Sequence, residues 1–298
     1  MPAESFRQIA KHLVPEPARK VLRGALHYGQ RVSLWPVILD QVRGTTWRDQ
    51  RSLLRAAAAA PVLAWDSLLE WQDPILLDDA DVRVAGVGRF QLRKRCDDLY
   101  HVLPAREPGV LASIAALQPG DTFVDAGANI GFYTVLAAQR VGPKGRVVCV
   151  EMMPDTADRL ETHVRLNALD NVTIVRAALS DVAGETVRAV VTTGKFGQAS
   201  IAKASEAGGS SVDVQTATLD FVAKELPHVT LLKMDLEGAE LPALRGGGEL
   251  LQRTAAVVYE SWGAQRAEEN QVDALLLAAG FQLTRLDGNN WIARRPER

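Results

Sequence analysis

The 298-residue chain is short of several features that would mark particular protein classes. It has two cysteines, Cys96 and Cys149, which exclude a disulfide framework and are expected to be free thiols in a reducing compartment. Its formal net charge of −2 gives no overall attraction to nucleic acid. Because it lacks a signal peptide's apolar region and any run of about twenty apolar residues, we expect a cytoplasmic protein without a transmembrane segment.

The glycine-rich segment 123–131 is the most informative part of the chain. It predicts a buried strand, a glycine-rich turn and a helix over Phe132–Val141, an arrangement typical of a nucleotide-cofactor site. The spacing differs from the G-x-G-x-x-G fingerprint that receives a pyrophosphate. Asp125 takes the first motif position, and an anion there suits a positively charged ligand. The segment therefore favours the ammonium and sulfonium of a methionine-derived cofactor over a dinucleotide.

A second predicted strand, Arg146–Val150, ends in Glu151. Ligands of parallel sheets bind outside the carboxyl ends of the strands, where an acid can bind both hydroxyls of a ribose. An isolated acid after a strand is usually a solvated cap. The spacing between Glu151 and the glycine turn joins the two into one predicted site.

A third apolar strand, Val229–Met234, runs into Asp235, Glu237 and Glu240. With this element the chain resembles the FkbM family of S-adenosylmethionine-dependent methyltransferases over roughly residues 97–293. The resemblance rests on segments 125–131, 235–240 and 244–246 and on Glu151, with further matches at Asp97, Asp98, Tyr100, segments 178–181 and 218–220, and Trp291.

The resemblance implies an α/β, Rossmann-like domain with a seven-stranded, mostly parallel sheet, and usually methylation of a hydroxyl oxygen. It also implies roles for cofactor-binding residues. Those expected around the methionine part are Asp125, Gly127, Asn129 and Gly131; Glu151 holds the ribose, Met152 covers one adenine face, and Ser180 and Asp181 meet the adenine edge.

Methyl transfer to a hydroxyl requires alignment and removal of a proton, by a general base or by a metal that lowers the hydroxyl pKa. Asp235 and Glu260 end the fourth and fifth strands, so they are the predicted catalytic acids and the candidate ligands of a Mg²⁺ ion. The alternative is that Asp235 caps the following helix while Glu237 and Glu240 favour its positive end. His163 is interpreted as a helix-face residue and is not assigned to the chemistry.

The catalytic domain is predicted over residues 101–298, with strands at about 121–125, 146–150, 172–176, 229–234, 256–260, 281–286 and 290–294. The last two strands should form an antiparallel pair. Residues 1–100 are predicted to form an accessory region with helices at about 5–12, 17–28, 34–44 and 47–60, and a β-hairpin within 82–93. The breaks are expected at Pro15, Pro17, Gly29, Pro36, Gly44 and Pro61.

The first sixty residues are basic, with ten lysines or arginines against four acids, a local charge of about +6 (ten minus four). Such a region suits a membrane surface or a phosphate-bearing substrate. More often it is a solvated helix face or an oligomer contact. The basic region is thus consistent with two interpretations, a peripheral membrane contact and a contact within a homo-oligomer.

Between residues 185 and 218 two strand-like runs, 186–192 and 211–216, flank a segment rich in glycine, serine and alanine. We expect this segment to be a loop that gates the substrate.

The leading hypothesis is a methyltransferase that uses S-adenosylmethionine to methylate a hydroxyl of a saccharide or secondary metabolite. The alternatives are N-methylation of a small molecule and a catalytically silent cofactor-binding module that serves assembly. A dinucleotide oxidoreductase is disfavoured by the glycine spacing. The acceptor is not determined by any residue pattern.

Overall fold

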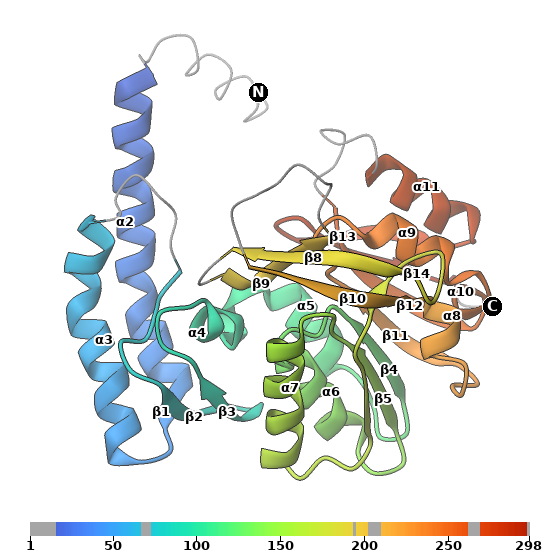
Figure 1. The fold of residues 1–298 in the computed structure, drawn as a ribbon, viewed down its shortest axis with the longest axis horizontal. Coiled ribbons are helices and arrows are strands. Elements are labelled where there is room, and N and C mark those ends of the chain that lie inside the picture. Colours follow the sequence, from blue (N-terminus) through green and yellow to red (C-terminus); the bar gives the residue numbers. More distant parts are fainter. Residues whose placement is uncertain (1–15, 67–72, 193–194, 202–209, 262–268, 297–298) are drawn as a thin grey trace.

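A seven-stranded sheet forms the centre of the computed structural model, which describes residues 16–66, 73–192, 195–201, 210–261 and 269–296 (Figure 1). Its strand order is β13-β14-β12-β11-β4-β5-β6. The strands are β4 (Thr122–Ala126), β5 (Arg146–Val150), β6 (Val172–Val175), β11 (Val229–Met234), β12 (Thr254–Glu260), β13 (Gln282–Asp287) and β14 (Asn290–Arg294). Neighbouring strands from β6 to β12 are parallel, and β14 is antiparallel to both β12 and β13. The predicted α/β fold is confirmed.

Helices cover both faces of this sheet. Successive residues of β4 alternate between them, so Phe123 joins one core cluster and Val124 the other. One face is covered by α5 (Pro108–Ala115), α6 (Phe132–Val141) and α7 (Pro154–Leu166), and the other by α8 (Leu219–Val222), α9 (Glu240–Arg245), α10 (Gly248–Gln252) and α11 (Glu269–Ala278). Burial on both faces leaves the strand ends as the place for polar groups.

The elements from α2 to β3, which we call the N-terminal unit, are two helices beside a three-stranded sheet. They are α2 (Glu16–Gln41), β1 (Val42–Gly44), α3 (Trp47–Asp66), β2 (Ala80–Val84) and β3 (Gly88–Leu92). The predicted hairpin is present as β2 and β3. The expected breaks at Gly29, Pro36 and Pro61 were wrong, since α2 runs through the first two and α3 through the third. Proline removes one helical N–H bond, and burial of Trp35 and Ile38 on either side anchors the helix there.

The N-terminal unit shares one continuous core with the central sheet. The Phe90 ring lies 6.2 Å from that of Phe132 and 5.1 Å from that of His163, between ring centroids. His163 lies on a helix, α7, as interpreted from the sequence, and the face that carries it is fully buried. Two short helices, α4 (Asp98–His101) and η1 (Pro104–Arg106), connect the unit to α5. The domain boundary at residue 100 stays a prediction.

A second sheet, of order β7-β10-β8-β9, follows β6 in the chain. Its strands are β7 (Ala178–Leu179), β8 (Thr186–Thr192), β9 (Lys195–Ile201) and β10 (Ser210–Ala217). The expected loop was wrong over 195–201, because this stretch pairs antiparallel with β8 and backbone pairing needs no particular side chain. Gly194, residues 202–209, Trp262 and the helix expected over 5–12 lie outside the described residues. Within the described chain, no helix is long and apolar enough to cross a membrane.

Candidate active site

The turn between β4 and α6 is shaped by three residues in the left-handed backbone region, Gly127, Asn129 and Gly131. A Cβ at Gly127 would clash with the backbone oxygen of Asp235, so only glycine fits between the ends of β4 and β11. Asn129 tolerates its φ of +51° because its side-chain oxygen accepts a hydrogen bond from the N–H of Ile130 at 2.7 Å. The backbone at the end of β4 therefore approaches the backbone at the end of β11 with no side chain between them.

Glu151 ties this turn to the segment after β5. Its Oε2 accepts a hydrogen bond from the N–H of Asn129 at 2.9 Å, and its Oε1 accepts one from the N–H of Met153 at 2.8 Å. Burial raises the pKa of Glu151 to about 7, although both backbone donors favour the ionised form. Each carboxylate oxygen can accept a second hydrogen bond, so the group retains capacity for two further donors.

Asp125 lies beneath the turn and is fully buried. Its Oδ2 accepts a hydrogen bond from the hydroxyl of Thr134 at 2.7 Å, and its Oδ1 lies 3.4 Å from Nζ of Lys233. Burial raises the pKa of Asp125, against the opposing charge of Lys233. The sequence analysis places Asp125 beside the ligand, and its burial means that it acts there through its two partners.

Lys233 is a functional candidate that the sequence analysis missed. Its Nζ donates to the carbonyl oxygen of Gly127 at 3.2 Å and lies between Asp125 and Asp235, 3.6 Å from Oδ2 of the latter. Burial lowers the pKa of Lys233, but the two carboxylates outweigh it and raise the value overall. The signal was present in the sequence, since a lysine within an apolar strand is almost never buried without a partner.

Asp235 and Glu260 are brought together at the carboxyl ends of neighbouring strands. Met234 pairs with Tyr259 across β11 and β12, so the next residue of each strand is one of these acids. Burial alone would raise the pKa of Asp235, but the charges of Lys233, Arg106 and His101 lower it overall. Among the described side chains, the three-member group suited to a metal is Cys96, Asp97 and Asp98, which includes neither strand-end acid.

The turn after Asp235 is held by Glu240. Its two carboxylate oxygens accept hydrogen bonds from the N–H groups of Leu236 and Gly238 at 2.8 and 3.0 Å. Helix α9 begins at Glu240 and its N-cap residue, Ala239, makes no side-chain cap bond, so the structure gives Asp235 no capping role.

Glu237 stands apart in this turn. It has a φ of +50° and an exposed side chain, and it lies two residues after Asp235. Burial, Asp235 and Glu260 together raise the pKa of Glu237 to about 7. A strained, non-glycine residue with a shifted pKa beside strand-end acids is typical of a functional position.

A polar wall from residues before the central sheet faces Asp235. Nδ1 of His101 accepts a hydrogen bond from Nη1 of Arg106 at 2.8 Å, and Nε2 of His101 lies 3.2 Å from the carboxylate of Asp97. Nη2 of Arg106 donates to Glu107 at 2.6 Å, and the hydroxyl of Tyr133 donates to the same carboxylate oxygen at 2.8 Å. The sequence analysis missed this wall, because its members come from separate short elements that carry no shared spacing.

Comparison with known proteins assigns the sequence that forms this site to a family. The methyltransferase FkbM domain matches residues 125–283, which is more than half of the chain. The chain belongs to the FkbM methyltransferase family. It is therefore an S-adenosylmethionine-dependent methyltransferase, as the sequence resemblance predicts.

Individual relatives of this FkbM protein share 37% or less of their residues with it over the matched segments. Methyltransferase sdnD of Sordaria araneosa is 30% identical over 209 residues, which are 60% of this chain and 80% of that protein. An arsenite methyltransferase of Halobacterium salinarum is 37% identical over 110 residues, 35% of this chain and 28% of that protein. The crystal structure of an FkbM methyltransferase from Methylobacillus flagellatus KT covers 89% of this chain and 59% of its own length, at 14% identity and a TM-score of 0.44.

The residues of this FkbM site fit S-adenosylmethionine by their own chemistry. The Gly127 turn admits close backbone approach, and Glu151 has spare acceptor capacity for a pair of hydroxyls. The buried Oδ1 of Asp125 accepts no hydrogen bond within the described chain, so negative potential remains beneath the turn. These features suit a nucleoside that carries hydroxyls and a positive charge.

The residues predicted for the adenine lie in two places. Met152 follows Glu151 and packs against a small apolar cluster that includes Met153 and Ala178. Ser180 and Asp181 hydrogen-bond to each other at 3.2 Å and lie against Gly246, after α9. The structure thus joins Met152 to the Glu151 region, while the contacts of Ser180 and Asp181 run to a different turn.

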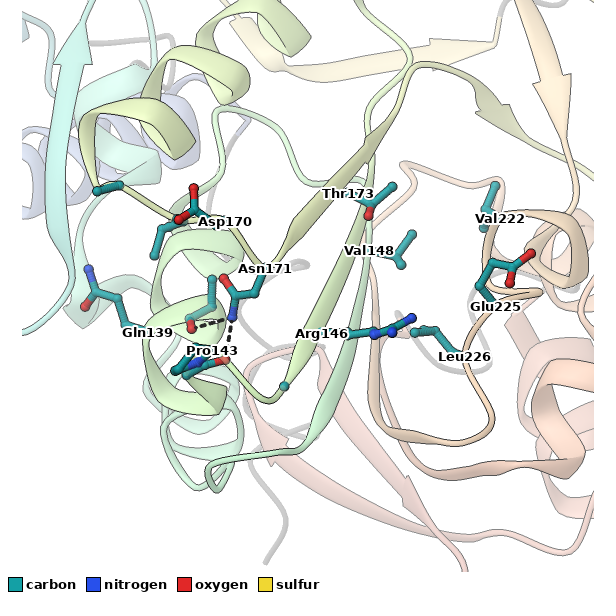
Figure 2. Close-up of a pocket in the computed structure, with 15 residues that line it drawn as sticks. Gln139, Pro143, Arg146, Val148, Asp170, Asn171, Thr173, Val222, Glu225 and Leu226 are labelled. Atoms are coloured by element: carbon teal, nitrogen blue, oxygen red, sulfur yellow. Dashed lines mark hydrogen bonds between the residues drawn. The ribbon is translucent and has the colours of Figure 1, made fainter.

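A separate hollow of about 540 Å³ lies at the opposite edge of the sheet, where β5 and β6 begin (Figure 2). The side-chain amide of Asn171 crosses its wall and donates to the carbonyl oxygens of Ala138 and Gly142 at 2.9 and 2.8 Å. Its lining includes Arg146 at the start of the strand that ends before Glu151. The hollow is therefore distant from the strand ends where the site groups gather.

Proposed function

We propose that this FkbM protein methylates a hydroxyl oxygen of a saccharide or secondary metabolite. The observation that carries the proposal is the junction of the Glu151 and Gly127 cradle with the acids Asp235, Glu237 and Glu260 at one edge of the sheet. When bound, S-adenosylmethionine supplies an electrophilic methyl group. A proton acceptor beside that group is what a hydroxyl acceptor requires.

We propose the following roles for the cofactor-binding residues. Glu151 accepts hydrogen bonds from the ribose hydroxyls, Met152 covers the adenine, and the backbone of Gly127, Asn129 and Gly131 borders the methionine part. From the resemblance we also carry over Asp125 beside the methionine part and Ser180 and Asp181 at the adenine edge. Asp125 would act on the methionine part from below the turn, where it pairs with Lys233.

On the acceptor side, Asp235 is ionised and suits the orientation of the acceptor hydroxyl, because a carboxylate accepts its hydrogen bond. Glu237, with a pKa of about 7, is the better proton acceptor at neutral pH. Asp235 and Glu260 are retained as candidate ligands of Mg²⁺, whose involvement the proposal leaves to experiment.

N-methylation of a small molecule and a silent cofactor-binding module are the competing functions. An amine acceptor needs less help in losing its proton, and a silent module needs no acids at the strand ends. We further propose a cytoplasmic location, supported by the free, buried thiols of Cys96 and Cys149.

The test is transfer of labelled methyl from S-adenosylmethionine into glycan and small-molecule fractions of a host extract, with Mg²⁺ and in parallel with EDTA. We expect label in a hydroxyl-bearing acceptor, stable to conditions that hydrolyse methyl esters. Loss of label with EDTA supports the metal. Label on nitrogen, or cofactor binding without any label, contradicts O-methylation.

A further inference from the structure

The outer face of α3 carries large apolar side chains that are exposed. Trp47, Leu54 and Val62 are 70%, 44% and 65% exposed, and all three lie on this one helix. At about 100° per residue they fall within an arc of about 80°, and they span about 22 Å along the axis. Leu53, Ala56 and Ala60 lie on the opposite side and are buried. Helix α3 therefore has a second apolar stripe, directed to solvent.

Three arginines lie at one side of this stripe, Arg51 within its arc and Arg48 and Arg55 just beyond it. Arg48, Arg51 and Arg55 are exposed and lie within about 60° of one another around the helix. We define the α3 outer face as Trp47, Arg48, Arg51, Leu54, Arg55, Ala58 and Val62. No acid among the described side chains of α3 lies on this face. Asp49 is turned toward the N-terminus of α3, where it accepts hydrogen bonds from the hydroxyl and the N–H of Thr46 at 2.7 and 3.0 Å.

A hollow of about 330 Å³ opens beside these arginines. It is lined by Trp47, Arg48, Arg51, Ser52, Arg55, Asp78 and Asp79. Asp78 pairs with Arg55 at 2.9 Å, and Asp79 accepts a hydrogen bond from the N–H of Lys94. Within the described chain Arg48 and Arg51 have no such partner, so the hollow keeps positive charge next to an indole ring.

We propose that the α3 outer face docks onto an anionic phospholipid membrane surface. A helix with tryptophan and aliphatic residues on one stripe and arginines beside it is suited to lie in the plane of the interface. The indole belongs at headgroup level, and the guanidinium groups reach lipid phosphates with paired hydrogen bonds.

Charge also decides against a second copy of the chain as the occupant. A two-fold contact through this face would bring each set of three arginines toward the same set on the partner. Beside them in the described chain lie two acids, Asp78 and Asp79, and Asp78 is already paired with Arg55, so each copy keeps an excess of positive charge. An anionic lipid surface supplies the missing negative charge, and the attraction accumulates with each arginine.

The experiment is co-sedimentation of the full chain with phosphatidylcholine vesicles, with and without about 30 mol% phosphatidylglycerol, at about 0.05 and about 0.5 M NaCl. We expect binding to the anionic vesicles at low salt and its loss at high salt. Each arginine near the surface contributes about fivefold to partitioning, so R48Q/R51Q should lower the partition coefficient about 25-fold. The matched control is R140Q/R294Q, which removes two exposed arginines from α6 and β14.

The apolar stripe is tested with Trp47→Phe and brominated lipids. Bromine quenches the fluorescence of tryptophans that enter the lipid. The chain has six tryptophans, so the part of the quenching that is lost in this variant comes from Trp47 alone. Unchanged thermal unfolding and S-adenosylhomocysteine binding would show that the variants are folded. The proposal is overturned if the parent ignores anionic vesicles, if both double variants lose binding equally, or if Trp47→Ser instead dissociates a dimer of the parent. Binding of inorganic phosphate by the parent without any binding to vesicles would reassign the hollow to a free anion.

Discussion

Glu151 is a buried carboxyl whose charge changes near neutral pH, and this makes cofactor binding dependent on pH. Ribose hydroxyls donate to the ionised form, so the group must lose its proton to bind. Since its pKa in the free protein is about 7, we expect affinity for S-adenosylhomocysteine to be full above pH 7 and to fall by up to about tenfold per unit below it. Calorimetry across pH 6 to about 8.5 measures this. In E151Q the dependence should disappear, whereas E161Q on α7 should keep it; a parent affinity flat across this range would contradict the assignment.

Glu237 should control the pH dependence of the transfer step. A base with a pKa of about 7 gives a rate that rises with pH and levels off above that value. We expect E237Q to lower kcat/KM about 10² to 10⁴-fold and to abolish this rising limb. D235N should lower the rate and keep the limb, because the pKa of Asp235 lies lower. The measurement uses the acceptor fraction that the labelled-methyl assay finds, with S-adenosylmethionine saturating at every pH, so that the titration of Glu151 does not contribute to the limb. A limb that survives in E237Q would exclude Glu237 as the base.

Lys233 holds two carboxylates together, and its removal should cost stability. Lys233→Met leaves Asp125 buried without its counter-charge, a change that costs about 3 to 5 kcal/mol. Urea unfolding at neutral pH measures the loss. The double variant D125N/K233M should recover much of it, because the uncompensated charge is gone. Lys224→Met, an exposed change, should have little effect. Equal stability of K233M and the parent would show that the ion pair contributes nothing.

At the scale of elements, the β4 turn depends on the close approach of β11. Gly127→Ala combines strain at a φ of +81° with a clash against the backbone of Asp235. Gly120→Ala is the matched control, because its φ of +95° is equally unfavourable but its Cβ would enter open space. We expect Gly120→Ala to cost about 1 to 3 kcal/mol and Gly127→Ala clearly more, with loss of S-adenosylhomocysteine binding. Thermal unfolding and calorimetry measure both, and equal effects would mean that the turn relaxes freely.

The central sheet was predictable because its signals are local. Its parallel strands are mostly apolar runs of four to seven residues, and Asp125, Glu151 and Asp235 lie at or directly after the ends of three of them. Strand β9 gave no such signal, because it is held by pairing with β8 and not by its own composition. Arg106 and His101 were missed for a related reason. They converge on Asp235 from short helices, and tertiary packing alone determines that meeting.

At the scale of the whole molecule, the N-terminal unit is attached to the methyltransferase sheet by polar groups as well as by the shared core. The Asn167 side chain accepts a hydrogen bond from the N–H of Arg89 and donates to its carbonyl oxygen, both at 2.8 Å, so α7 satisfies part of the β3 backbone. Gly88 beside it leaves room for this amide, since a Cβ there would meet Oδ1 of Asn167. The unit is thus docked in a fixed register and not merely tethered.

His163 makes this docking sensitive to acid. Its Nδ1 donates to the carbonyl oxygen of Ile130 at 2.6 Å. Its Nε2 lies 2.9 Å from the N–H nitrogen of Gln91 and 3.2 Å from the carbonyl oxygen of Gln91, and the shorter contact is made by the neutral imidazole, whose Nε2 accepts. Burial lowers the pKa of His163 below its usual value, although the hydrogen bonds to the backbone of Ile130 and Gln91 and the charge of Asp98 act in the opposite direction. The unfolded chain therefore binds more protons than the folded one. The contribution of His163 is complete above about pH 6.5 and is lost as pH falls below it.

The prediction compares the free energy of unfolding of the parent and His163→Gln across pH 5 to about 7.5. Other groups titrate in both proteins, so their difference isolates His163. The parent should lose stability relative to the variant by up to about 1.4 kcal/mol per pH unit below about 6.5, because at most one proton is taken up. His228→Gln, at an exposed position before β11, should follow the parent at every pH. Parallel curves for the parent and His163→Gln would mean that the imidazole can charge without leaving its place, and that its bond to the β3 backbone does not require the neutral form.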